Sequence, residues 1–386
     1  MWGIGTPDQA SGKRQVIFLM EQWKLFRILP NVEVVHAFET LSDHVAVVSY
    51  DDDRALAIRS QSKAALKLWE GFRDIYGNAQ RPSGLIFVDG FEQVKNAQEA
   101  IVAFRNIVAM SSILPSWAEL RTQPGSTPTG PLWSDAWALY PVEVSANDTL
   151  LTVNPALLVG SSPDAPFVGM PNPLISVYGD RFQVDWPLFA LLLQAWDNQY
   201  IRSRRPAWYY EALFRALEIA MHALAVPVQN LSSVHDFGLS LAIWVSAFEV
   251  LIHPGRGGKV DETRVLQFLA SASSRWDNPK LRHKRYVVTV GGKIERVYHQ
   301  LYSARNTHLH GNAILKRHWS YVGRRGSIAV GNLAPLVFRT ALKLRLGWEL
   351  SRSISRVIGS GLDPTTYATV MEWCDARYED ALVGSM

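Results

Sequence analysis

The sequence predicts a two-domain protein, in which an α/β or α+β domain of residues 1–185 precedes an all-α domain of residues 186–386. The first part mixes strand and helix periods, whereas the second carries apolar residues at three- and four-residue spacing almost throughout. Charge divides at the same place. Residues 1–185 hold 14 basic and 20 acidic side chains, a net −6, and residues 186–386 hold 25 and 15, a net +10. A basic domain joined to an acidic one suggests that the second domain meets a polyanion.

Composition indicates a globular protein in a reducing compartment. The chain has 386 residues, of which 48% are hydrophobic, so sizeable cores are available. Cys374 is the single cysteine, which excludes an intrachain disulfide framework. The N-terminal stretch lacks the pattern of a signal peptide. The most apolar stretch, residues 237–252, is shorter than the roughly 20 residues of a membrane-spanning helix and carries Glu249. We therefore expect a cytoplasmic protein without a membrane segment.

The N-terminal domain is predicted from alternation, helical spacing and Pro-Gly breaks. In chain order we expect a hairpin of 31–38 with 44–50, a helix over 54–76, a strand at 83–90, a helix over 91–113, a loop at 123–131, a strand-turn-strand unit over 137–160 and a Pro-rich connection at 161–173.

The C-terminal domain is predicted as a series of helices whose breaks carry proline. We expect helices over 186–200, 207–225, 233–253, 261–276, 291–314, 333–358 and 363–381, with a loop or short hairpin at 281–293. No repeat or heptad run is apparent.

One segment, "LYSARNTHLHGN" at residues 301–312, collects chemistry-bearing side chains. On a helix Asn306 and His310 are neighbours, as are Arg305 and His308. Arg305 and His310 are five apart and so rotated by about 140°. One helix does not aim both groups at one atom, but two copies across a twofold axis could bring two arginines and two histidines into one cleft.

These residue types suit cleavage of an RNA backbone. The 2′-hydroxyl must lose a proton and the 5′-oxygen must gain one, and histidine titrates where both are feasible near neutral pH. The attacked phosphate gathers negative charge, to which a guanidinium offers paired donors. No metal is needed for this scheme.

The segment also resembles a known family. "RNTHLHG" is similar to the Arg-Asn-x-x-x-His-Gly form of the HEPN superfamily signature, in the branch found in bacterial anti-phage and abortive-infection proteins. "LSLAIWVSAFEVLIH" resembles the family's helix with a central glutamate, here Glu249, and "ERVYHQLYSARNTHLHG" its Tyr-x-x-Arg-Asn run. The resemblance covers roughly residues 206–355, and residues 1–185 match no family.

The resemblance implies an all-α HEPN bundle that dimerises with its motif helices face to face. It implies a metal-independent endoribonuclease that leaves a cyclic phosphate and a 5′-hydroxyl. Carried over by position, His310 would be the catalytic histidine, Arg305 the phosphate-stabilising arginine and Asn306 the polar residue that positions them. No cofactor or metal is expected.

Basic residues flank the segment on both sides and predict an RNA-binding groove, with Trp319 and Tyr321 available for stacking on bases. A solvated loop is the alternative interpretation for each of them. They are Lys280, Arg282, Lys284, Arg285, Lys316, Arg317, Arg324 and Arg325.

Each candidate has a structural alternative. Arg305 could pair with Glu249 or a helix carbonyl, His310 could be a helix-end histidine, and Asn306 could be a cap. Gly311 could be a small residue where helices approach or bend. Arg215 and His222 form a second Arg/His pair at a longer spacing. They lack the adjacent Asn and trailing Gly, so we do not assign them to the motif.

Two parts of the sequence could suggest a metal site. His299, His308, His310 and His318 are crowded together, but His308 and His310 point about 200° apart on a helix, and no acidic residue or cysteine lies between Arg296 and Arg345. "DDDR" at 51–54 could serve a metal-dependent hydrolase, although adjacent aspartates diverge and read more simply as charge at a strand end or helix start.

The sequence thus predicts a homodimeric HEPN ribonuclease that acts on single-stranded RNA as a toxin or anti-phage effector. The acidic N-terminal domain would sense, restrain or direct it, and a separate antitoxin or defence-system protein is a candidate partner. The alternative is a non-catalytic module that dimerises or binds RNA or a partner protein.

Overall fold

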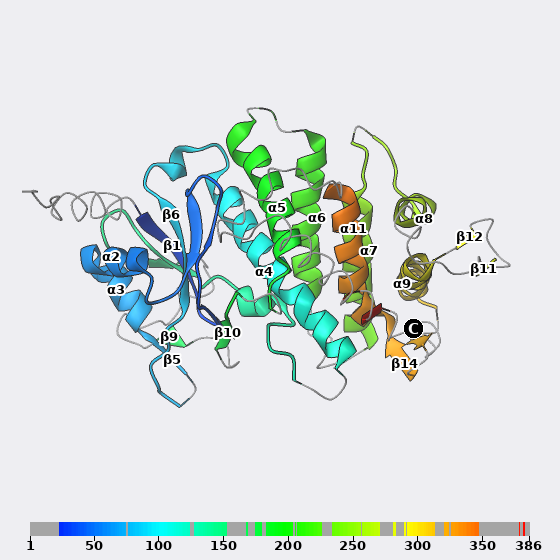
Figure 1. Ribbon diagram of the computed structural model, residues 1–386, viewed down its shortest axis with the longest axis horizontal. Coiled ribbons are helices and arrows are strands. Elements are labelled where there is room, and N and C mark those ends of the chain that lie inside the picture. Colours follow the sequence, from blue (N-terminus) through cyan, green and yellow to red (C-terminus); the bar gives the residue numbers. More distant parts are fainter. Residues whose placement is uncertain are drawn as a thin grey trace, which may run out of the picture. The chain divides into compact units, whose positions relative to one another are not determined.

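The structure, a computed structural model, forms two compact units (Figure 1). One lies within Met1–Ile101 and Ala136–Gly179, the other within Val102–Asp135 and Asp180–Met386. The residues that it describes are 23–74, 76–123, 127–152, 167–168, 174–179, 183–203, 205, 207–225, 234–255, 257–270, 281–282, 289–290, 292–312, 320–323, 326–346, 378 and 381–382. The predicted mixture of strands and helices in the N-terminal region and the mainly helical C-terminal part are confirmed.

The first unit is built on a four-stranded antiparallel sheet. Its order is β1 (Trp23–Leu29), β6 (Ser83–Val88), β4 (Val45–Val48) and β3 (Phe38–Glu39). Every residue of β4 is fully buried, because four consecutive small or branched apolar side chains occupy both faces of the sheet. The predicted strand at 83–90 is β6, and the predicted hairpin is reduced to β3 and β4.

The other strands of this unit form short pairs. β2 (Val32–Val34) pairs in parallel with β10 (Ile175–Val177), and β5 (Phe72–Arg73) with β9 (Phe167–Val168). The predicted strand-turn-strand unit is the hairpin of β7 (Val142–Val144) and β8 (Leu150–Thr152). Alternation correctly marked residues 32–34 as strand but assigned them the wrong partner, since period 2 identifies a strand and not its neighbour.

Two helices pack on the sheet where one had been predicted. They are α2 (Asp53–Gln61) and α3 (Lys63–Glu70), and the break falls at Ser62. Ser62 has extended backbone angles, and its Oγ accepts a hydrogen bond from Ala65 N at 2.9 Å, which begins a new helix. Trp69 of α3 is fully buried and donates Nε1–H to the Pro82 carbonyl at 2.8 Å. A Cβ on Gly84 of β6 would overlap the Trp69 ring, so glycine admits the indole there.

The helix α4 (Ala97–Thr122) lies mostly in the second unit, although residues 102–135 had been assigned to the domain of residues 1–185. Among the described residues it is the helix long and apolar enough to cross a membrane. However, most of it is buried inside the protein. Apolar residues all round α4 require cover on all sides, which makes it a core helix of the helical unit.

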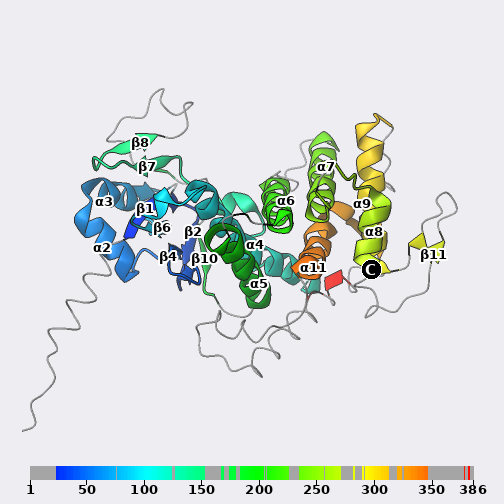
Figure 2. The same cartoon turned by 90° about the horizontal axis from the view of Figure 1, so that it is seen from above.

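The helical elements of the second unit follow the predicted order. They are α5 (Trp186–Asp197), the π-helix η4 (Asn198–Arg202), α6 (Trp208–Ala225), α7 (Val234–Leu251), α8 (Glu262–Ala270), α9 (Lys293–Leu309) and α11 (Ala334–Leu346). α7 contacts α6 and α9, and α9 also contacts α8 (Figure 2). The predicted helix over 363–381 lies largely outside the described residues.

Short elements connect these helices. β11 (Leu281–Arg282) and β12 (Thr289–Val290) form a hairpin, where the sequence predicts a loop or short hairpin over residues 281–293. A second hairpin of β13 (Ser320–Gly323) and β14 (Gly326–Ala329) had not been predicted, because four-residue strands are too short to show a period. Single 3₁₀ turns occur at η1 (Phe91–Gln93), η2 (Ser134–Trp137) and η7 (Val330–Leu333).

A buried ion pair ties distant segments of the helical unit together. Arg339 of α11 donates Nε–H to Asp185 Oδ2 at 2.5 Å, and the two side chains are 3% and 0% exposed. Asp185 also caps α5, since its Oδ1 accepts from Leu188 N at 3.1 Å, and its own N–H donates to Ser111 O of α4 at 2.8 Å. The guanidinium lies 3.6 Å from the centre of the Tyr378 ring. One residue therefore connects three helices, since Asp185 bonds to α4 through its backbone N–H and to α5 and α11 through its carboxylate.

Candidate functional site

The predicted site residues lie at the C-terminal end of α9, which is an amphipathic helix. Its buried face is formed by Ile294, Val297, Tyr298, Leu301 and Ala304. These positions recur at three- and four-residue spacing, and this face packs against α7. Tyr298 meets Phe248 of α7 edge-on, with ring centroids 5.0 Å apart. Packing thus fixes the rotation of the helix and with it the direction of every side chain in the motif.

The helix ends in a left-handed glycine cap. His310 is the residue at the helix end, and Gly311 follows with φ +66°. Gly311 N–H donates to His308 O and Asn312 N–H to Thr307 O, each at 3.1 Å. This pair of bonds is the Schellman arrangement. A Cβ on Gly311 would meet nothing within 4 Å, so the glycine serves the backbone turn, and the alternative of a close helix approach does not apply.

Arg305 and Asn306 are brought together by the structure. Arg305 donates from Nη1 to Asn306 Oδ1 at 2.9 Å, and its guanidinium lies 5.2 Å from the Tyr302 ring centre. The Nε of Arg305 is buried and has no hydrogen-bond partner among the described residues. Both side chains are half-buried, whereas His310 is exposed beyond the helix end. Asn306 thus bonds to Arg305 within the last turn of α9 and does not cap a helix start.

Arg305 interacts electrostatically with ionisable groups of α7 and α9. Burial raises the pKa of Glu249, the charge of Arg305 opposes this and Asp261 adds to it. Burial also raises the pKa of Tyr298 well above its usual value, with Glu249 contributing in the same direction. The Tyr298 hydroxyl is buried and has no hydrogen-bond partner among the described residues. The charge of Arg305 thus opposes the rise in the pKa of both Glu249 and Tyr298.

The three described histidines on α9 and at its end have different surroundings. His299 pairs through Nδ1 with Glu262 of α8, and His308 lies against Gly238 of α7. His310 is exposed at the cap. Within the described part of the chain no group of three or more His, Cys, Asp or Glu could hold a metal ion, and His318 lies outside that part.

Most of the predicted RNA-binding residues lie outside the described residues. These are Lys280, Lys284, Arg285, Lys316, Arg317, Arg324 and Arg325, together with Trp319. The backbone of Arg282 belongs to β11 and that of Tyr321 to β13, so both stand on hairpins adjacent in sequence to α9. The predicted groove thus stays a prediction.

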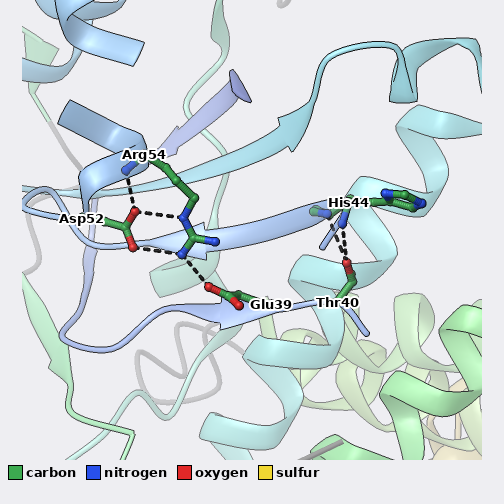
Figure 3. Close-up of polar contacts among 6 residues, drawn as sticks. Glu39, Thr40, His44, Asp52 and Arg54 are labelled. Atoms are coloured by element: carbon green, nitrogen blue, oxygen red, sulfur yellow. Dashed lines mark hydrogen bonds and ion pairs between the residues drawn. The ribbon is translucent and has the colours of Figure 1, made fainter. Parts of the chain in front are cut away.

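The three aspartates of "DDDR" have separate structural uses. Asp52 caps α2 by accepting from Arg54 N at 2.9 Å, and it holds the Arg54 guanidinium at 3.0 and 2.9 Å (Figure 3). The same guanidinium reaches Glu39 Oε1 at 2.6 Å. Asp51 pairs with Arg81 at 3.4 Å, and Asp53 lies in the first turn of α2. The aspartates diverge, as expected for the ends of a strand and a helix, and this structure does not favour the hydrolase hypothesis.

The second Arg/His pair of the sequence lies on the surface of a helix. Arg215 and His222 lie on α6, and both are exposed. Arg215 stacks over Trp208 with its guanidinium 5.8 Å from the ring centre. Both residues of the pair lie within the helix, whereas His310 is the residue at the C-terminal end of α9.

Two residues of the site were not singled out from the sequence. Tyr298 is buried on α9, and burial together with Glu249 raises its pKa. Tyr302, in contrast, belongs to the Tyr-x-x-Arg-Asn run, and its ring centre lies 5.2 Å from the Arg305 guanidinium. Gly238 had passed as an ordinary member of an apolar helix. A glycine inside a helix is costly, and that cost was the signal that another group approaches closely there.

Comparison of the chain with protein-family models, with curated proteins and with solved structures found no match.

Proposed function

We propose that this chain is a metal-independent endoribonuclease of the HEPN type, which cleaves single-stranded RNA by attack of the 2′-hydroxyl on the adjacent phosphate. His310 transfers a proton and Arg305 stabilises the charge that gathers on the phosphate. The active site is composite and forms where two copies face each other. The enzyme acts in the cytoplasm as a toxin or anti-phage effector, under the control of its N-terminal region or of a partner protein.

The observation that carries the proposal is the separation of the two groups at the end of α9. Arg305 is held by Asn306 on the helix, while His310 stands exposed after the last turn. An exposed histidine at a rigid cap is accessible to a substrate, and an arginine with an orienting partner needs little rearrangement to meet a phosphate. A second copy supplies the opposing pair that one helix cannot.

The test is cleavage of a labelled single-stranded RNA in EDTA, with the product ends mapped. Wild type is expected to leave a cyclic phosphate and a 5′-hydroxyl. Arg305→Ala and His310→Ala are each expected to lose 10²-fold or more, in line with about 10²–10⁴ for a proton-transfer group. The matched controls are Arg215→Ala and His222→Ala on α6, which should cut like wild type. Full activity of either motif variant would refute the mechanism, and loss of cleavage in EDTA would refute its metal independence.

A second candidate is a non-catalytic module that uses the helical unit to dimerise or to bind RNA. One observation favours it: Arg305 already has a hydrogen-bond partner and an aromatic contact within its own helix. RNA binding that persists in wild type and His310→Ala alike, with no bond broken by either, would support this candidate over the ribonuclease.

A further inference from the structure

Gly238 of α7 and His308 of α9 are in direct contact. Gly238 is buried, and a Cβ added to it would overlap Nδ1, Cγ and Cδ2 of the His308 ring. These ring atoms are its three nearest neighbours. A residue with a side chain at position 238 would therefore displace the imidazole. The ring of His308 thus lies in a space beside Gly238 that a side chain at position 238 would fill. We call this space the seat.

The helix α7 cannot easily move away from the ring of His308. Phe237 and Leu241 flank Gly238 on α7 and are buried. They pack against η7, where a Cβ on Gly331 would lie 3.0 Å from Phe237 Cε2 and 3.4 Å from Leu241 Cδ2. Both sides of this end of α7 are therefore in contact with other elements. A steric change at Gly238 is more easily relieved by movement of the α9 terminus than by movement of α7.

The residue in the seat also carries the cap of α9. The backbone carbonyl of His308 accepts the N–H groups of His310 and of Gly311. Its ring contacts α7, while its carbonyl bonds to His310 and Gly311. The N–H of His310 also donates to Asn306 O of the same helix at 3.0 Å. The cap therefore links the position of His308 to that of His310, which has no helix beyond it.

We propose that His308 is a positioning residue whose ring, seated on Gly238, sets the place and direction of His310. This inference rests on the proposed function, in which His310 transfers a proton. Proton transfer depends steeply on geometry, and a displacement of about 1 Å can reduce a rate by about 10²-fold. His308 points about 200° away from His310 around the helix, so it acts through position and not as a second acid or base.

The first test is a rescue experiment on cleavage rates. Gly238→Ala should clash with the ring and lower kcat on the order of 10²-fold with little change in KM. His308→Ala should lower kcat because the seat is left empty. In the double variant the new methyl group occupies the space of the missing ring, and kcat should recover at least tenfold over Gly238→Ala. Ser246→Ala, which loses only a bond to Ala242 O further along α7, is the control expected to match wild type.

Rescue separates positioning from mere stability. If His308 only contributed to packing, the variants would lose thermal stability while kcat per folded protein stayed constant. That result, or a double variant as slow as Gly238→Ala, would overturn the inference.

The second test does not depend on activity. In protein labelled at histidine, the NMR resonances of the His310 ring should shift in Gly238→Ala and return toward the wild-type positions in the double variant. If wild type cuts no RNA, the proposed function fails, and these spectra alone decide whether the seat positions His310. Unchanged His310 resonances in Gly238→Ala would overturn the inference even if wild type is fully active.

Discussion

Asp185 is a fully buried carboxylate whose charge is retained by its partners. Burial on its own would raise its pKa, but the charge and hydrogen bond of Arg339 outweigh this, with Lys343 and Leu188 N–H acting in the same direction. The net pKa lies below the ordinary 3.8. Because the folded pKa is depressed, the stabilisation is present above the unfolded pKa and is lost as the pH falls through the folded value. Acid conditions below about pH 4 should therefore weaken the helical unit.

Asp185→Asn tests this ion pair. The amide oxygen still accepts from Leu188 N, so the cap is kept while Arg339 loses its counter-charge in a buried site. We expect a loss of about 3–5 kcal/mol in the free energy of unfolding at pH 7, measured with urea. Asp185→Leu combined with Arg339→Met should be less damaging than either single change. Equal stability of Asp185→Asn and wild type at pH 7 would contradict this account.

Glu249 shows the opposite behaviour. Its pKa is raised above 4.5 chiefly by burial, so the folded state holds its proton more tightly than the unfolded state. The unfolding free energy therefore falls as the pH rises from 4.5 through the folded pKa. Arg305 limits this loss because its charge favours the ionised carboxylate.

Glu249→Gln should accordingly stabilise the protein at neutral pH and match wild type below about pH 4. Arg305→Ala should raise the pKa of Glu249 further and steepen the decline. Denaturant titrations over a pH series measure both effects, and Glu211→Gln at an exposed position of α6 is the control. A Glu249→Gln protein less stable than wild type at pH 7 would indicate that the carboxylate is needed for a contact.

At the scale of single elements, the end of α9 depends on the left-handed residue Gly311. Gly311→Ala places a Cβ at φ +66°, which L-residues rarely adopt, so we expect a loss of about 1 kcal/mol or more in thermal unfolding. Gly311→Asn should lose less, because asparagine tolerates this region. Because the space around Gly311 is open, a Gly311→Ala loss far above that of strain alone would mean that a contact had been missed.

The sheet of the first unit has its own sensitive position. Gly84→Ala would drive a methyl group into the Trp69 ring, and overpacking of this kind costs about 1–3 kcal/mol. Tryptophan fluorescence and urea unfolding should both report the change. Trp69→Phe should relieve the clash when combined with Gly84→Ala. Additive losses in the combined variant would show that the two residues do not compete for space.

Helices whose apolar stripe extends over several turns were predictable from the sequence. Breaks between helices and the pairing of strands were not. The helices α5, α6 and α7 were predicted to within a few residues because their apolar stripes extend over several turns. The break at Ser62 was missed because a capping serine inside a periodic stretch does not interrupt the stripe. The parallel partner of β2 was missed because it lies at β10, about 140 residues further along the chain.

At the scale of the whole molecule, the sequence predicted the types of structure correctly but divided the chain in one place, while the units are discontinuous. α4 precedes the predicted boundary and yet belongs mostly to the helical unit, because hydrophobicity on all faces specifies burial without specifying the partner. For the site, the motif placed Arg305 and Asn306 correctly on one helix. Gly238 inside an apolar helix indicates a close approach there, but the sequence does not specify that His308 of α9 is the group that approaches.

The proposed dimer makes a prediction at this scale. If each site takes Arg305 from one copy and His310 from the other, a mixture of Arg305→Ala and His310→Ala proteins regains activity, since one site of every heterodimer is intact. Refolding equal amounts together should restore about a quarter of the wild-type rate. Each variant refolded alone is the control. No recovery in heterodimers whose formation has been verified would place both groups of a site on the same copy.

The ion pair between Asp185 and Arg339 also has a consequence for synthesis. The two residues are 154 positions apart in the chain. Because a ribosome adds about 5–20 residues per second, Arg339 is synthesised on the order of 10 s after Asp185. α4 is made earlier still, and α11 emerges only with Arg339. During this interval the nascent chain carries Asp185, which bonds to α4, without the partner of its buried ion pair. During this interval chaperone binding competes with aggregation, and slower translation through α11 should lower the yield of native protein.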